Sequence, residues 1–323
     1  MKTPIVVLCV LAALMYVPVP GCGQELPSTI TLTLPSLSWA LEIPGTGFRT
    51  ERPRMASSLE SRSVLATNKQ TSVTLSAFLE KAPKPGTARE CRDYYWSRAQ
   101  QSPIHKEQIG MSEAGDIAIV EYFVPEWMGM KVQQKNMSVY LAQDGYWIDI
   151  HISKPLFKPQ DEKLFQDIVK GIRIRRDYVP TPTDLIGFAA IHYMRREYAQ
   201  AVPFYEKALE QEKKKPTLDP KTWKHLVDQL GMSYGMSANL KKAKDLYEWG
   251  IQREPEYPMF YYNLACTDAE LGDKQEAVRN LKLAFRYKQN MPPGERLRDP
   301  RQDSSFREHL TDPAFAAELG NLK

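Results

Sequence analysis

The sequence lacks several short catalytic and cofactor-binding motifs. No P-loop, no H-E-x-x-H zinc motif, no C-x-x-C pair and no G-x-G-x-x-G run occurs among its 323 residues. The histidines are few and do not have the spacing of metal ligands: His105, His151, His192, His225 and His309. His151, in an alternating strand, and His192, at a packing position of a helix, are typical of structural histidines. We therefore expect no catalytic residue, no metal site and no cofactor, and a protein that is not an enzyme.

Cysteine and unbalanced charge are also scarce. Of four cysteines, Cys9 and Cys22 belong to the first 23 residues, which leaves Cys91 and Cys266. Two lone thiols on predicted helices are typical of buried small hydrophobic residues rather than of a disulfide. The formal net charge is only +4, and the charges are interspersed, with no basic run that alternates with aromatic residues. Nucleic acid is therefore not expected as a partner.

The one strongly apolar run lies at the start and is too short to cross a bilayer comfortably. Ile5–Val17 follows Lys2 and is ended by prolines, which is typical of a secretory signal over residues 1–23. Residues 19–22 (VPGC) also resemble a loose lipobox, which would place a lipid on Cys22; cleavage without a lipid is the alternative. We expect an exported protein of the periplasm or cell envelope, held to a membrane only through that lipid.

One pattern recurs in residues 184–290. Leu230 and Leu264 are 264 − 230 = 34 residues apart, and Ala243 and Ala277 show the same step. A weaker first copy carries Ala201, which precedes Ala243 by 243 − 201 = 42 residues, so 42 − 34 = 8 extra residues lie near residues 210–220. In each copy, apolar residues at helical spacing form two stripes separated by a turn. The sequence therefore predicts three helical hairpins that stack on one another.

The second copy is the clearest, and the residues that carry its pattern are, in order, Val227, Leu230, Gly231, Tyr234, Ala243, Tyr247, Gly250 and Pro255. Small residues at 231, 243 and 250 predict a close approach of two helix backbones, with the bulky residues beside them. This pattern resembles the tetratricopeptide repeat, W-x2-L-G-x2-Y, A-x3-F and P over 34 residues. The third copy departs from it at Asp268 and Gln289, and the first at Phe188 and Ala189.

The chain before the repeats predicts an α+β domain over residues 36–175, after a polar lead (residues 24–35). Leu37, Trp39, Leu41 and Ile43 alternate with polar or small residues, as in a half-buried strand. More alternating strands follow, with a helix after a capping box at residues 87–90, an Asp-Gly hairpin at 144–145 and a helix over 161–170. This order predicts one antiparallel sheet with packed helices. Residues 176–183 predict a linker, and residues 291–323 a segment that caps the last repeat.

Two phrases of this domain resemble the PsbP-like fold, an antiparallel sheet between helices. They are SLSWALEIPGTGF (residues 36–48) and LFQDIVKGIRI (residues 164–174). Members of that fold are mostly non-enzymatic accessory modules of extracytoplasmic proteins. The resemblance implies no catalytic residue that could be carried over to this chain.

The repeats predict a concave surface, because one face of each first helix is left free by its partner helix. By spacing, that groove holds ten residues: Ile186, Ala190, Tyr193, Met194, Asp228, Met232, Met236, Tyr262, Asn263 and Cys266. The set is rich in Met and Tyr and has no cation, which suits an apolar segment of a protein partner rather than the acidic C-terminus that the family's best-known groove clamps. Alternatively, these side chains pack on the chain's own first domain or tail.

Three hypotheses follow. The first is an exported, non-enzymatic adaptor or assembly factor that uses the groove, with the loop at Pro125–Met130 as a second docking point. The second is a first domain that binds a small ligand or performs hydrolysis. A deep pocket lined by His105 or His151 with a carboxylate would favour it. The third is a purely structural lipoprotein.

Overall fold

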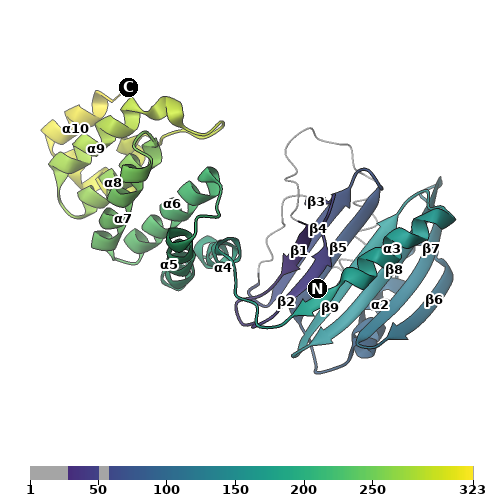
Figure 1. Cartoon of the computed structure of the whole chain (residues 1–323). Helices are drawn as coiled ribbons and strands as arrows, with labels where there is room; N and C mark the ends of the chain where they lie inside the picture. Colours follow the sequence, from purple (N-terminus) through teal and green to yellow (C-terminus); the bar gives the residue numbers. More distant parts are fainter. Residues whose placement is uncertain (1–27, 51–57, 323) are drawn as a thin grey trace. The chain divides into compact units, whose positions relative to one another are not determined.

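The chain forms two compact units, which divide between Val179 and Pro180 in a computed structural model that describes residues 28–50 and 58–322. Antiparallel sheets make up the first unit and a run of helices makes up the second (Figure 1). This confirms the predicted fold class, an α+β domain followed by an all-α domain of helical repeats. The predicted signal segment, with Cys22, lies outside the described residues.

The first unit holds two sheets where the sequence predicted one. A three-stranded sheet has the order β1-β2-β10, and a seven-stranded sheet has the order β3-β4-β5-β9-β8-β7-β6. The prediction is wrong because β10 returns to pair with β2, where Arg173 lies opposite Glu42. The strands are β1 Thr29–Leu32, β2 Ala40–Pro44, β3 Arg49–Thr50, β4 Ser61–Asn68, β5 Val73–Lys81, β6 Glu107–Ala114, β7 Ile117–Trp127, β8 Met130–Gln143, β9 Tyr146–Lys154 and β10 Arg173–Arg175.

The predicted polar lead (residues 24–35) contains a strand, so that prediction is wrong. The run TITLTL over residues 29–34 alternates threonine with Ile30, Leu32 and Leu34, and these three side chains are buried. Alternation of this kind places one face of a strand in a core. β1 therefore belongs to the domain, which begins before Ser36.

The two faces of the seven-stranded sheet are covered by different elements. One face packs with the small sheet and with α3 (Glu162–Gly171) in an apolar cluster that includes Leu41, Ile150 and Phe165. The other face packs beneath α2 (Ala88–Gln100), where Trp96 and Trp147 belong to a second cluster. Both predicted helices of this domain thus cover sheet surface, as a layered α+β fold requires.

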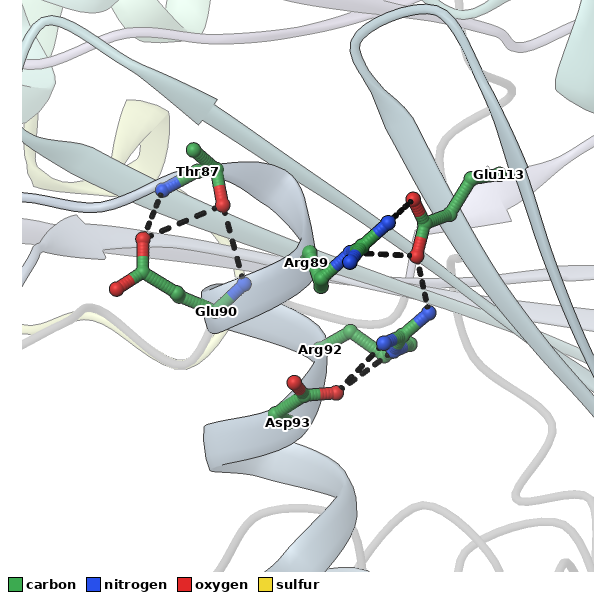
Figure 2. A network of polar contacts seen from close by, with 6 residues as sticks. All are labelled: Thr87, Arg89, Glu90, Arg92, Asp93 and Glu113. Atoms are coloured by element: carbon green, nitrogen blue, oxygen red, sulfur yellow. Dashed lines mark hydrogen bonds and ion pairs between the residues drawn. The ribbon is translucent and has the colours of Figure 1, made fainter.

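An ion-pair cluster ties α2 to the edge strand β6 (Figure 2). Glu113 of β6 accepts hydrogen bonds from Arg89 Nη2 at 2.7 Å and from Arg92 Nη1 at 2.8 Å. At the start of the helix, Thr87 and Glu90 form the predicted capping box: Thr87 N donates to Glu90 Oε2 at 2.9 Å, and Glu90 N donates to Thr87 Oγ1 at 3.4 Å. The ion pairs hold α2 against β6, and the capping box satisfies backbone N–H groups at the start of the helix.

Two tight turns close the β7–β8 and β8–β9 hairpins. Asp144 and Gly145 have φ values of 48° and 79°, and Met128 and Gly129 have 49° and 80°. Positive φ at both central residues is the geometry of the type I′ hairpin, which confirms the predicted Asp-Gly turn. The predicted loop at Pro125–Met130 is instead mostly strand, because β7 continues to Trp127 and only two residues turn.

The second unit contains three helical hairpins in sequence. They are α4 Pro182–Met194 with α5 Tyr198–Lys214, α6 Pro220–Met236 with α7 Leu240–Arg253, and α8 Pro258–Glu270 with α9 Lys274–Arg286. Residues 215–219, between α5 and α6, lie within the stretch where the sequence placed the eight extra residues. Thr181 caps α4, and its hydroxyl accepts from Asp184 N at 3.2 Å. Pro182 then takes the first helical position, where a missing N–H costs nothing.

The chain ends in four short helices that close the last repeat. They are η2 Lys288–Asn290, η3 Pro300–Gln302, η4 Ser304–Thr311 and α10 Pro313–Gly320. Phe306, Phe315 and Leu319 are buried in one cluster with residues of α8 and α9, and Leu310 packs partly buried against it. The segment covers apolar surface that a further repeat would otherwise cover, as a terminal cap does.

Candidate functional site

Close packing of each hairpin determines which face of its first helix stays free. A Cβ on Gly231 of α6 would lie 2.6 Å from the Tyr247 hydroxyl oxygen and nearer still to its ring, and one on Gly250 would lie 3.1 Å from Phe260. The Tyr247 hydroxyl donates to the Asp228 carbonyl at 3.2 Å across the hairpin. α7 therefore occupies the Gly231 side of α6.

All ten predicted groove residues lie on the first helices α4, α6 and α8, and contacts join them from one helix to the next. The Tyr193 hydroxyl of α4 donates to Met232 Sδ of α6 at 3.2 Å. Asn263 Nδ2 of α8 donates to Asp228 Oδ1 of α6. These two contacts join the three first helices to one another, and we term the ten residues together the groove surface.

The groove surface is open at some positions and closed at others. Met194, Met232 and Met236 are 58%, 36% and 62% exposed. Five more residues of the set are half-buried: Ala190, Tyr193, Asp228, Asn263 and Cys266. Ile186 and Tyr262 are buried, so their prediction as surface residues is wrong. Ile186 packs in the apolar cluster of the first two repeats, and Tyr262 lies beneath the C-terminal segment.

The C-terminal segment covers the α8 end of the groove surface. The Tyr262 hydroxyl donates to Asp303 Oδ2 at 3.2 Å, and its ring meets that of Phe306 edge-on at 6.2 Å. His309 Nε2 lies 2.8 Å from the Ala269 carbonyl oxygen near the end of α8. Of the two alternatives that the sequence left open, packing on the chain's own tail holds for this end. The open part of the groove surface lies on α4 and α6.

Asp228 is the acidic group of the groove surface. Burial raises the pKa of Asp228 to about 7. The hydrogen bond from Asn263 lowers this pKa, and the charge of Glu295 raises it, but both effects are smaller than that of burial. Among the described residues, no lysine or arginine forms an ion pair with Asp228. A cationic group placed beside it by a partner would favour the ionised carboxylate.

A pattern that serine hydrolases share, G-x-S-x-G, occurs in α6. Residues 231–235 read GMSYG, which matches G-x-S-x-G. Ser233 is buried within α6, and its hydroxyl donates to the Gln229 carbonyl at 2.7 Å. The nucleophile of that motif stands exposed on a strand-to-helix turn, so the match carries no catalytic meaning at this position.

The first unit has an open cleft at the β7–β8 hairpin. Its volume is about 550 Å³, and His105, Glu107, Glu126, Trp127 and Lys131 are among the residues that line it. His105 Nε2 lies 3.0 Å from Glu107 Oε1, and both side chains are exposed. The combination of a histidine with carboxylates is the feature that would favour the ligand-binding hypothesis. It is not accompanied by a buried nucleophile or base among the lining residues.

His151 lies away from this cleft, on the face of the sheet that α2 covers. Its Nε2 is 3.4 Å from the Tyr122 hydroxyl, and burial lowers the pKa of His151 to about 4. It is therefore a neutral, packed histidine at physiological pH. Among residues 28–50 and 58–322 no group of three or more His, Cys, Asp or Glu side chains is placed to hold a metal ion, and no helix there is long and apolar enough to span a bilayer.

Comparison with solved structures lists proteins that are similar to less than half of this chain each. The chain is similar to YrrB, a tetratricopeptide-repeat protein with a peptide-binding site described as unusual, at 14% identity and a TM-score of 0.31, over 40% of this chain and 59% of YrrB. It is similar to PcrH from Pseudomonas aeruginosa at 16% identity and a TM-score of 0.32, over 44% of this chain and 87% of PcrH. It is also similar to the PsbP protein of Synechocystis sp. PCC 6803 at 16% identity and a TM-score of 0.33, over 49% of this chain and 99% of that protein.

The chain thus spans about three fifths of the length of YrrB. No protein-family model and no curated protein matches the sequence. These structural likenesses concern the fold alone. What the groove surface binds has to be argued from its own residues.

Proposed function

We propose that the second unit binds a segment of another protein on its groove surface, and that the chain acts as a non-enzymatic adaptor or assembly factor. The supporting observation is the set of exposed methionines on α4 and α6, two helices that the hydrogen bond from Tyr193 to Met232 joins. Methionine side chains are flexible and polarisable, which suits a surface that accepts an apolar helix or extended segment.

The proposal includes export. Residues 1–23 have the pattern of a secretory signal, and the adaptor would then act in the periplasm or cell envelope. A lipid on Cys22 would hold it at a membrane, and cleavage without a lipid would release it. No part of the proposal requires nucleic acid, a metal or a cofactor.

Capture of partners from an extract of the cells that make the protein tests the groove surface. The paired change Met232→Glu with Met236→Glu introduces two charges at exposed positions without touching the core. Leu271→Glu, at a residue that is 48% exposed outside the groove surface, is the matched control. We expect the paired variant to lose partners that the wild type and the control retain. Identical partners for all three proteins would count against the proposal.

The cleft of the first unit supports a second candidate, the binding of a small ligand. It combines an aromatic side chain, Trp127, with charged groups of both signs, which is the make-up of many ligand sites. Saturation-transfer NMR with a fragment mixture tests it. Binding that is lost in Trp127→Ala but retained in Leu271→Ala, at an exposed residue of the second unit, would support this candidate.

A further inference from the structure

Residues 291–299, between η2 and η3, lie beside the α8 end of the groove surface, because Leu297 packs partly buried against the cluster that contains Tyr262 of α8. We term this segment the strap; it forms the yellow-green loop that precedes the terminal helices in Figure 1. The charge of Arg298 acts on Tyr193 of α4 and on Tyr262 of α8. The charge of Glu295 acts on Asp228 of α6. The packing of Leu297 places the strap beside the groove surface, and these charge effects on Tyr193 and Asp228 agree with that placement.

The strap is held firmly at its ends and lightly in between. At one end Asn290 Nδ2 donates to the Glu256 carbonyl at 3.1 Å, and at the other Tyr262 donates to Asp303. Between these anchors Leu297 packs half-buried against the cluster that contains Phe306. The strap has no helix or strand of its own, and the side chains of Pro293, Glu295, Arg296 and Arg298 are exposed.

A turn presets the shape of the strap. Glu295 N donates to the Pro292 carbonyl at 3.0 Å, and Gly294 has a φ of 86°. Proline followed by glycine at the two central positions is the composition of a type II turn. The turn leads directly into Arg296-Leu297-Arg298. The turn restricts the conformations of the segment, so docking it costs little conformational entropy.

We propose that the strap is a built-in competitor that occupies part of the groove surface and resembles the segment of the partner that displaces it. This inference rests on the proposed function and names its chemistry. The competing segment is extended and carries a leucine-sized apolar residue next to an arginine. The apolar residue replaces Leu297 at the cluster, and the arginine takes the place of Arg298 beside Tyr193 and Tyr262. Phe306 and the rest of the cap stay in place, because they belong to the core.

The strap supplies its own probe, a labelled peptide of residues 290–303. It is titrated against the full chain and against a full-length variant in which residues 292–298 are replaced by seven glycine and serine residues. The natural strap is present at a high effective concentration, so it should exclude the free peptide from the unaltered chain. We expect the replaced variant to bind the peptide at least about tenfold more tightly than the unaltered chain.

Matched peptides identify the contact that matters. Leu297→Ser in the peptide should abolish binding to the replaced variant, whereas Arg296→Ser, at an exposed position of the same strap, should retain it. Equal affinity for the two proteins, or no binding to the replaced variant, would overturn the inference. If the replaced variant does not bind the peptide while the unaltered chain still captures partners, only the inference about the strap is rejected. If the peptide binds the replaced variant but capture of partners does not depend on Met232, the proposed function is rejected and the inference about the strap stands.

Discussion

Gly231 and Gly235 lie one turn apart on α6 and face different surroundings. A Cβ at 231 would collide with the Tyr247 side chain, which is buried and packed within the hairpin. A Cβ at 235 meets no atom within 4 Å. The same chemical change at these two positions therefore separates packing between helices from the intrinsic cost of glycine in a helix.

We expect Gly231→Ala to destabilise the helical unit by about 1–3 kcal/mol, because the added methyl group forces α6 and α7 apart. Gly235→Ala should stabilise it by up to about 1 kcal/mol, because alanine restricts the unfolded chain and favours the helix. Urea unfolding followed by circular dichroism measures both changes. Equal shifts of the same sign would contradict the close approach of the two helices.

Asp228 should make the stability of the helical unit depend on pH. Burial raises the pKa of this carboxyl to about 7 in the folded state, above its ordinary value. As pH rises from 4 to 7, the unfolded chain therefore loses the proton before the folded chain does, and stability falls. Above pH 7 the full cost of the buried charge remains.

Asp228→Asn removes this titration. The free energy of unfolding of the variant minus that of the wild type should be about 2 kcal/mol larger at pH 8 than at pH 5. Thermal unfolding of both proteins at the two pH values provides the comparison. A difference that is independent of pH would show that the carboxyl at 228 titrates normally.

At the scale of elements, the cap depends on one aromatic side chain. Phe306 of η4 is fully buried, with ring contacts to Tyr262 at 6.2 Å and to Phe315 at 6.3 Å. Phe306→Ala should destabilise the helical unit by about 3–5 kcal/mol, because it leaves a cavity in the last cluster. Leu310→Ala, at a half-buried position of the same element, should cost clearly less in the same urea titration. A smaller effect at 306 than at 310 would contradict the role of the cap.

Most elements could be predicted because each has a local signal. The hairpins of the repeats follow from apolar spacing, and the turn at Asp144-Gly145 follows from the need for positive φ. β1 was missed because it is only four residues long, and the second sheet was missed because the pairing of β10 with β2 joins segments about 130 residues apart, such as Arg173 and Glu42. No local pattern encodes such a pairing.

The groove surface shows the same division. Helical spacing placed the ten residues on the three first helices, since these helices follow a regular repeat. It could not show that Tyr262 is covered, because the strap and η4 are short, irregular and rich in proline and charge. Their docking on α8 depends on packing between segments, such as Phe306 on Tyr262, rather than on periodicity.

At the scale of the whole molecule, export predicts a processed chain. Mass spectrometry of the protein from its own cells should find an N-terminus at or next to Cys22, since the apolar run before it has the length of a signal and not of a membrane span. A mass increase for a diacylglyceryl group on Cys22 would establish the lipid anchor. A chain that retains residues 1–17 would contradict export by this signal.

Binding of a partner on the groove surface is the central claim, and site-specific photocross-linking in living cells tests it most directly. A photoreactive amino acid replaces Met232 in one protein and Leu271, which is also exposed, in another. We predict a covalent adduct with a second polypeptide from position 232 and none from position 271. The absence of any adduct at 232, or the same adducts at both positions, would contradict a partner-binding groove.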